Sequence, residues 1–166
     1  MVKAAAKLVC GVVLVVMGVA AALLVGMRMK SPLVLDAVRR FNRDVTNRFT
    51  METAGTPGAY ASVIRHVGRT TGLPHETPVR ATATDDGFLI ALPYGTRADW
   101  LKNVRASGSA TIVDEGTTYE VDQPEIIPLA DVSSQFPLMD QRTLSRFGVD
   151  QCLRVRRVTA DQAAAS

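Results

Sequence analysis

The chain has 166 residues, a formal net charge of +3 and a hydrophobic content of 47%. This length allows one small domain besides a membrane segment, and it leaves no room for a second independent core. The modest charge and the 5% aromatic content argue against a nucleic-acid surface, which combines cations with stacking rings. With two cysteines, two histidines and no C-x-x-C pair, we expect no bound metal.

The amino-terminal segment Leu8–Met27 carries no charged residue over twenty positions. A helix needs about 20 apolar residues to cross a bilayer, so residues 1–30 are predicted to form a transmembrane anchor. A cleaved secretory signal is the main alternative, because Lys3 and Lys7 make a basic start and alanines follow at 20–22. The apolar run exceeds the usual signal core of about 7–15 residues, so we favour a retained anchor over a signal or a buried core helix.

The charges around this span indicate its orientation. Lys3 and Lys7 precede it, and a larger basic set follows it: Arg28, Lys30, Arg39, Arg40, Arg43 and Arg48. Cytoplasmic flanks carry the excess of lysine and arginine, so we expect a single-pass protein of the cell membrane with its domain in the cytoplasm. The same cations suit anionic headgroups, which makes membrane lipid an expected partner.

Residues 31–57 are predicted to form an amphipathic linker helix. Ser31 and Pro32 end the first helix and supply a cap and a first-turn proline for the second. The apolar stripe of this helix is Val34, Val38, Phe41, Val45 and Phe49, and its polar side holds Arg39, Arg40, Arg43, Asp44 and Asn47. The helix has three candidate positions: on the membrane surface, over the domain as a cap, or packed on the domain.

The most informative segment is Gly68–Val79. Its glycines, hydroxyl groups and single arginine allow backbone N–H groups and the side chains of Arg69, Thr70 and Thr71 to converge on one phosphate or carboxylate. An ordinary hairpin connection would have the same composition. The segment matches neither the P-loop nor the dinucleotide fingerprint, so an anion-binding turn is one of two interpretations.

A second segment, Tyr94–Asn103, favours the first interpretation. Together the two segments resemble the deazaflavin-dependent nitroreductase-like family, whose members carry approximately G-R-x-[ST]-G-x-x-R-x-x-P-[LV], a glycine loop and W-x-x-N. The residues that fit are Arg69, Thr71, Gly72, Pro78, Val79, Gly95, Trp100 and Asn103. The resemblance extends over residues 60–158 and over no part of 1–53.

The chain departs from the family pattern at two positions. Thr70 and His75 stand where the family often has lysine and arginine. Losing both cations weakens the expected grip on an anionic cofactor. Three other cations are candidates to compensate: Arg65, Arg80 and Lys102.

The resemblance implies a mainly β (α+β) fold, a flavin-reductase-like split β-barrel over residues 58–158. It implies binding of coenzyme F-420, the reduced 8-hydroxy-5-deazaflavin, and transfer of a hydride to a quinone, an enone or a nitro compound. The turn at 69–72 would hold the anionic tail, and Pro78, Val79, Tyr94 and Gly95 would lie against the ring. It also implies a lid over the acceptor at 41–51, and it leaves a homodimer open.

Alternating apolar residues give the coarse element order within the barrel. Strands are predicted at 59–66, 77–84, 88–92, 110–113, 117–121, 125–127 and 153–158, with a helix at 97–106 and short helices within 129–147. Residues 159–166 are predicted to form a disordered tail.

Several side chains have two interpretations each. Trp100 is a core anchor or a cofactor contact, and Asn103 satisfies a loop carbonyl or a ligand. His75 is an exposed turn residue, or a group by the cofactor phosphate that tightens binding in mild acid. The sequence shows no catalytic constellation, and Tyr94 and Tyr60 are the available proton donors.

We therefore expect a membrane-anchored, deazaflavin-dependent reductase of a lipophilic acceptor. Two alternatives remain open at this point. One is a non-enzymatic barrel that carries a lipid or fatty acid, and the other is a reductase on the same barrel that uses FMN.

Overall fold

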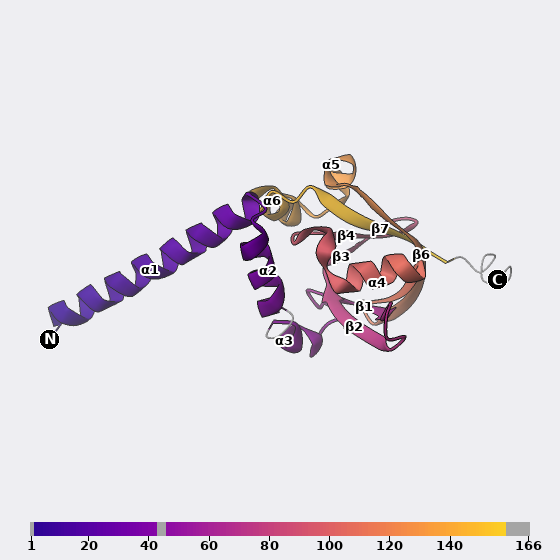
Figure 1. Ribbon diagram of the computed structural model, residues 1–166, viewed down its shortest axis with the longest axis horizontal. Coiled ribbons are helices and arrows are strands. Elements are labelled where there is room, and N and C mark those ends of the chain that lie inside the picture. The colour runs from indigo at the N-terminus through magenta and orange to yellow at the C-terminus, as the bar shows by residue number, and fades with distance from the viewer. Residues whose placement is uncertain (1, 43–45, 159–166) are drawn as a thin grey trace.

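The computed structural model describes residues 2–42 and 46–158. Within this part of the chain, seven antiparallel strands form one sheet in the order β2-β1-β5-β6-β7-β4-β3 (Figure 1). The strands are β1 (Ser62–Val67), β2 (Pro74–Val79), β3 (Ala81–Ala83), β4 (Gly87–Ala91), β5 (Ser109–Asp114), β6 (Thr117–Pro128) and β7 (Gln151–Arg157). β2 and β3 lie at opposite edges, yet only Arg80 separates them in the chain, so the sheet curls into a half-barrel.

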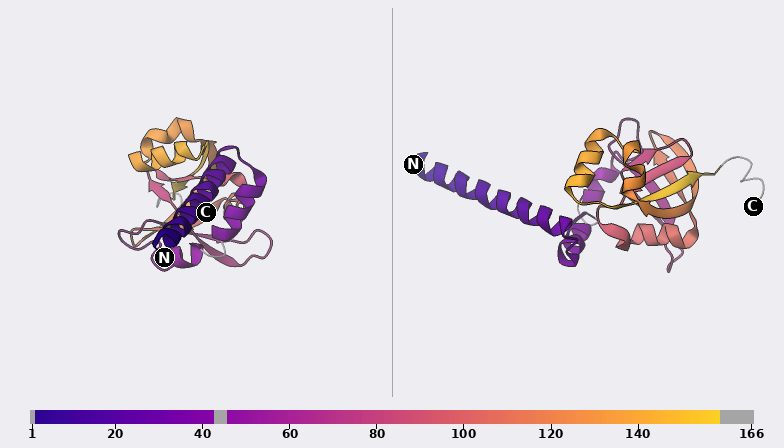
Figure 2. Two further views of the ribbon diagram at one scale, coloured as in Figure 1. Left: turned by 90° about the vertical axis from the view of Figure 1, so that its left-hand side faces the viewer. Right: turned by 90° about the horizontal axis from the view of Figure 1, so that it is seen from above.

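Helices cover the barrel and extend from it. They are α1 (Val2–Arg28), α2 (Pro32–Phe41), α3 (Asn47–Met51), α4 (Asp99–Ser107), α5 (Leu129–Val132) and α6 (Leu138–Arg146), with short 3-10 turns η2 (Gly95–Arg97) and η3 (Ser133–Gln135). α4 ends at Gly108, whose φ of 77° is the left-handed cap expected there. Figure 2 shows α1 projecting from the domain, with its last turns beside α2 and α6.

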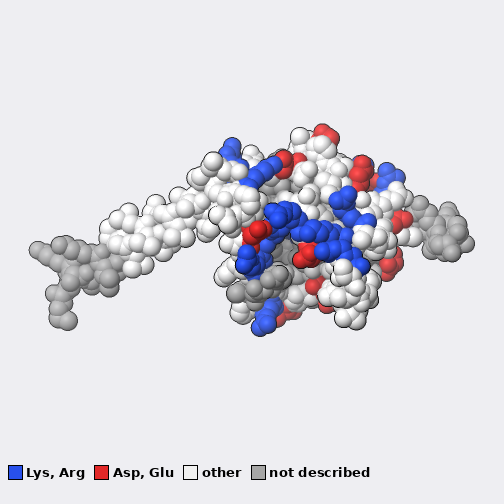
Figure 3. All heavy atoms as spheres, viewed as in Figure 1, with Lys and Arg blue, Asp and Glu red and all other residues white. Residues whose placement is uncertain are grey.

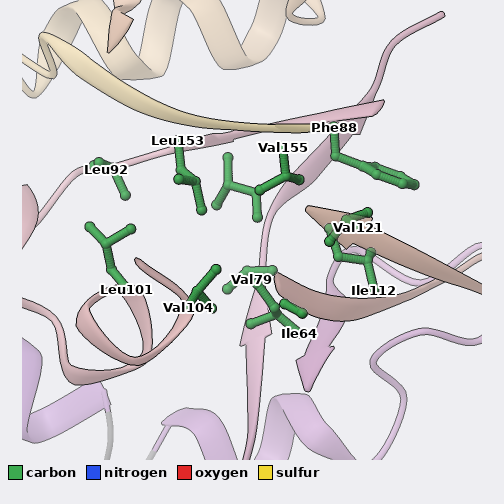
Figure 4. Close-up of a cluster of buried hydrophobic side chains, with 12 residues drawn as sticks. Ile64, Val79, Phe88, Leu92, Leu101, Val104, Ile112, Val121, Leu153 and Val155 are labelled. Atoms are coloured by element: carbon green, nitrogen blue, oxygen red, sulfur yellow. The ribbon is translucent and has the colours of Figure 1, made fainter. Parts of the chain in front are cut away.

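The barrel interior is filled by side chains that alternate along the strands. Phe88 of β4 points inward with Leu153 and Val155 of β7, and Leu101 and Val104 of α4 close the cluster (Figure 4). On the outer face of β4, β6 and β7, alternate residues pack with α5 and the segment after it. This second cluster is made by Leu89, Ile127, Leu129, Val132, Phe136 and Cys152. Burial raises the pKa of the Cys152 thiol to about 11, so this cysteine stays protonated and serves as a packing residue.

The predicted strands are confirmed with three differences. The strand predicted at 77–84 is broken at Arg80 into β2 and β3, because the chain changes sheet edge there. β2 also begins early, at Pro74, so the anion turn is shorter than its motif and ends at Leu73. The strands predicted at 117–121 and 125–127 are one strand, β6, with an irregular register between Asp122 and Glu125.

The apolar amino-terminal segment is one helix, of which Cys10–Arg28 is long and apolar enough to cross a membrane. None of that window is buried against the domain, which argues against a core helix of this chain, although a signal sequence would meet the same criteria. At its end, Gly26 lets α2 approach, since a Cβ there would lie 2.5 Å from the Val34 side chain. The tail predicted at 159–166 lies outside the described residues.

The linker helix does not present the face that its periodicity predicted. Phe41 and Phe49 are 61% and 70% exposed, whereas the Arg39 side chain, assigned to the polar face, is 18% exposed and turned toward the domain. α2 therefore turns a mixed surface that includes Arg39, and not its apolar stripe, toward the domain. Val45 of the predicted stripe lies outside the described residues.

Candidate functional site

A cleft of about 1220 Å³ opens between α2, the turn from β1 to β2, the loop Leu92–Arg97, α4 and α6. Figure 3 shows Lys and Arg side chains gathering in a band across this face, between α2 and α4. The cleft is larger than most small-molecule pockets, which hold about 300–1,000 Å³. It can hold an elongated ligand, or two ligands side by side.

The predicted cofactor residues share this cleft, apart from Gly72. Those that line it are Arg69, Thr70, Thr71, His75, Pro78, Val79, Tyr94, Gly95, Trp100 and Asn103. Gly72 has φ of 67° and donates its N–H to the Gly68 carbonyl, so its contribution is the shape of the turn. Thr71 also acts locally, because its Oγ1 accepts a hydrogen bond from the N–H of Leu73 at 3.3 Å.

Arg69 is held by α4. Its backbone N–H and its Nη1 both donate to Asn103 Oδ1, at 3.2 Å and 2.8 Å, and its Nη2 lies 3.2 Å from Asp99 Oδ1. The Asp99 side chain is 70% exposed, so this ion pair is weak and an incoming anion can compete for the guanidinium. The turn is thus fixed by Asn103, while the charge of Arg69 stays available to the cleft.

Asn103 is buried and also determines the protonation of a histidine. Because its Oδ1 faces two N–H donors, its Nδ2 is the group that points at His66 Nδ1, at 3.2 Å. His66 Nδ1 must therefore accept, and its Nε2 carries the proton toward Thr77 Oγ1 at 3.2 Å. Burial, followed by the nearby His75, lowers the pKa of His66, in agreement with this neutral tautomer.

His75 is exposed, as one interpretation held, but it is not a turn residue. It lies in β2 opposite His66, and the two rings stack with centroids 5.7 Å apart. Its ring also lies close to Gly68, where a Cβ would stand 3.0 Å from its Nε2. His75 therefore forms part of the wall behind the turn.

Most of the described cations that line the cleft were not predicted to be part of the site. They are Arg39 and Arg40 of α2, Arg48 of α3 and Arg97 of η2. Arg39 pairs with Asp36, one turn back on the same helix. Burial and then the charge of Arg97 lower the pKa of Arg39, and the carboxylate of Asp99 opposes this shift. The signal was present as four arginines near Ser31–Met51, but they were related to anionic headgroups of the membrane and not to the cleft.

The three cations expected to compensate for Thr70 and His75 have other partners. Arg65 pairs with Glu76 at 2.8 Å, Lys102 lies 3.9 Å from Asp99, and neither lines the cleft. Arg80 does line it, but it pairs with Asp140 at 3.1 Å and lies over the Tyr60 ring at 4.4 Å. Within the described residues, the cations that line the cleft without a partner on another element include Arg39 and Arg40 of α2 and Arg97 of η2.

The two tyrosines differ in their surroundings. Tyr94 is half-buried, and its hydroxyl accepts a hydrogen bond from Asn42 Nδ2 at the end of α2. Burial raises the pKa of Tyr94, which keeps the phenol protonated and leaves its O–H free to donate. Tyr60 is 74% exposed at the rim of the cleft, and it is the poorer candidate for proton transfer.

Both interpretations of Trp100 have structural support. Its side chain is half-buried and packs against the barrel core, and it also lines the cleft. Together with Val79, Ile90 and Leu92 it makes an apolar floor beneath the cations. A curled half-barrel with an apolar floor and a cationic rim is suited to a planar ring that carries an anionic tail, and this defines the class of redox-cofactor barrels.

Comparison with known proteins identifies the family. The model of the F420H(2)-dependent quinone reductases matches residues 34–142, and the chain belongs to this family. It is therefore an F420-dependent oxidoreductase with coenzyme F420 as its cofactor, which confirms the resemblance seen in the sequence, and the FMN alternative is not needed. The match begins within α2, earlier than the resemblance, which started at residue 60.

Solved structures give weaker similarities. An F420 reductase is 12% identical, with 65% of this chain and 92% of that chain covered at a TM-score of 0.44. A domain-swapped dimer is 12% identical, with 76% and 100% covered at 0.49. An F420-H2 dependent reductase is 10% identical, with 57% and 92% covered at 0.41. No curated protein matches the sequence.

Proposed function

We propose that this protein is a membrane-anchored reductase that transfers a hydride from reduced coenzyme F420 to a lipophilic acceptor, most suitably a quinone. The observation that carries the proposal is a cleft lined by the arginines Arg39, Arg69 and Arg97 and by the apolar side chains of its floor. Arginines bind an anionic group through charge-assisted hydrogen bonds, and an apolar floor accepts a ring. An enone or a nitro compound would suit the same cleft.

The residues present fit the cofactor. The anionic tail would lie along the arginine wall, with Arg39, Arg97 and Arg69 as its partners. The ring would lie on the floor near Pro78, Val79 and the Tyr94–Gly95 loop. When bound, the reduced coenzyme supplies a hydride from carbon 5 of its ring.

Tyr94 supplies the remaining proton in this proposal. A quinone that gains one hydride and one proton becomes a hydroquinone, so the reaction balances with a single proton donor. The hydrogen bond from Asn42 turns the Tyr94 oxygen toward α2 and leaves its own hydrogen for the acceptor. Solvent would reprotonate the phenol between turnovers.

The apolar helix α1 is the proposed membrane anchor. The window Cys10–Arg28 is apolar, unburied and followed by cations, which supports a retained span with the barrel on the cytoplasmic side. Reduced cofactor is expected in that compartment, and a lipophilic acceptor is expected in the bilayer. Protease protection of the barrel in sealed vesicles, with its loss on permeabilisation, tests the orientation.

The function is tested by binding and turnover with the full chain in detergent. Quenching of Trp100 fluorescence is followed during titration with oxidised F420, FMN and a fatty acid, and reduced F420 is then mixed with quinones, enones and nitro compounds. We expect saturable F420 binding and oxidation of reduced F420 with quinones. Fatty-acid binding without F420 binding would favour the carrier alternative and would refute the proposal.

A further inference from the structure

Part of the cleft lining comes from α1, α2 and the α6 region, whose elements meet where Arg28 contacts the end of α6. Asp140 and Thr143 are polar exceptions on α6, but most of the side chains from these elements away from the arginines are apolar: Met27, Val38, Phe136, Leu144, Phe147 and Val149. We call this part of the lining the apolar end. Phe136, Leu144 and Val149 belong to the apolar cluster on the outer face of β4 and β7, so this end is supported from below. It is chemically distinct from the wall that holds Arg39 and Arg97.

This end is built against the root of α1. Arg28 Nη1 donates to the carbonyl oxygens of Ser145 and Arg146 at 3.2 Å and 3.3 Å, which satisfies the end of α6. Lys30 pairs with Asp150, just beyond α6. The close approach of Gly26 and Val34 fixes the bend between α1 and α2. The apolar helix therefore joins the domain at a defined place rather than through a loose tether.

The chain order places this end at the level of the bilayer surface. The uncharged run ends at Met27, which lines the cleft, and Arg28 is the first charge after it. Val38 lies one turn after Val34, on the side of α2 that faces the root of α1. A hydrocarbon chain leaving the bilayer beside α1 meets apolar side chains at once.

We propose that this apolar end is the binding site for the hydrocarbon tail of a lipid-soluble acceptor, which enters from the bilayer between α1, α2 and α6. The inference rests on the proposed function and adds to it the route and the chemical class of the acceptor. The arginine wall takes the anionic cofactor, and the Met27 end takes a long isoprenoid or acyl tail. The acceptor ring then lies between them, over the floor near Trp100 and Tyr94.

The test compares two quinones with the same head group, one with a long isoprenoid tail and one with a methyl group in its place. Each is titrated against the full chain in phosphatidylcholine nanodiscs, with quenching of Trp100 fluorescence as the readout and no cofactor present. In Val38→Asp a carboxylate meets the tail, and we expect affinity for the tailed quinone to fall by about tenfold or more, since burying an unpaired polar group is costly. The methyl quinone and oxidised F420 should change much less.

Two further variants make the outcome decisive. Met139→Asp is the matched control, because Met139 is 70% exposed on α6 and does not line the cleft, and it should leave both quinones unaffected. Val38→Phe fills the same place without a charge and should give the same selective loss if Val38→Asp fails to fold. Equal weakening of both quinones, or an equal effect of Met139→Asp, would overturn the tail site. If the unmodified protein neither bound F420 nor oxidised reduced F420, the proposed function itself would be refuted.

Discussion

The two cation-bearing walls of the cleft are built in different ways. On the turn from β1 to β2, Arg69 is fixed by two hydrogen bonds to Asn103 and by Asp99 on α4. On α2 the Arg39 side chain is more buried than that of Arg69. The first wall is held by hydrogen bonds to another element, α4, whereas Arg39 is held within α2 by Asp36 and the Leu35 carbonyl. We expect the turn wall to set the shape of the cleft and the helix wall to contribute more to anion affinity.

The largest expected effect comes from breaking the turn wall at Asn103. Asn103→Leu leaves the Arg69 N–H and His66 Nδ1 without their partner, and because each orphaned group costs about 1–3 kcal/mol, we expect the free energy of unfolding to fall by about 2–4 kcal/mol. Denaturant unfolding measures the change. The exposed neighbour Lys102→Leu is the control and should stay within about 0.5 kcal/mol of the unmodified protein. Equal stability of the two variants would contradict the role given to Asn103.

The helix wall is tested by removing one charge. Arg39→Met keeps much of the side-chain volume, and we expect it to weaken F420 binding by about 1.5–3 kcal/mol, the range for hydrogen bonds to charged groups. Isothermal titration at low salt gives the dissociation constant. Arg105→Met, at an exposed position of α4 outside the cleft, should leave it unchanged. If both substitutions change the dissociation constant equally, the arginines of α2 do not bind the anionic tail of the cofactor.

Arg69→Ala should have a smaller effect on the same titration. Its guanidinium must leave Asp99 to meet the cofactor, so the net loss is expected at about 0.5–1.5 kcal/mol, that of an ordinary hydrogen bond. Asp99→Asn removes the competing carboxylate and should tighten binding slightly. A loss for Arg69→Ala larger than that for Arg39→Met would reverse the assignment of the two walls.

The smallest effect concerns pH. The pKa of His66 is lowered in the folded protein, so its contribution to stability is complete above the unfolded value of 6.5 and is lost as pH falls through the folded pKa. In that window the free energy of unfolding should fall by at most about 1.4 kcal/mol per pH unit. His66→Gln should flatten this part of the profile, measured by thermal unfolding between pH 4 and 7, about the range in which histidine titrates. An unchanged slope would show that His66 is not the titrating group.

Much of the barrel was predictable because its strands alternate. Phe88 and Ile90 face one way and Leu89 the other, and the helix predicted at 97–106 is found as α4 at Asp99–Ser107. The break at Arg80 was not predictable, since local alternation continues through it and only the closure of the sheet separates β2 from β3.

The site was predictable where a local motif carries it. The glycine and hydroxyl pattern located the turn. The family pattern predicted that Trp100 and Asn103 belong to the same site, and both line the cleft with the turn. The arginines of α2 were missed because a helical wheel ranks residues by polarity, whereas the Arg39 side chain is only 18% exposed and lines the cleft. The bridging role of Asn103 depends on His66, 37 positions away, and no spacing rule connects them.

The position of β7 has a consequence for how the protein is made. It is the last of the described strands, yet it lies between β6 and β4, and its partner residues in β4 were synthesised much earlier, as in the pair Phe88 and Val155, which are 67 positions apart. Until Gln151–Arg157 leaves the ribosome, the sheet is divided into two halves with unpaired edges. Folding of the barrel is then expected to be slow, and to finish long after the apolar first helix has emerged. A premature stop near residue 142, where the family match ends, would remove the strand that joins the halves.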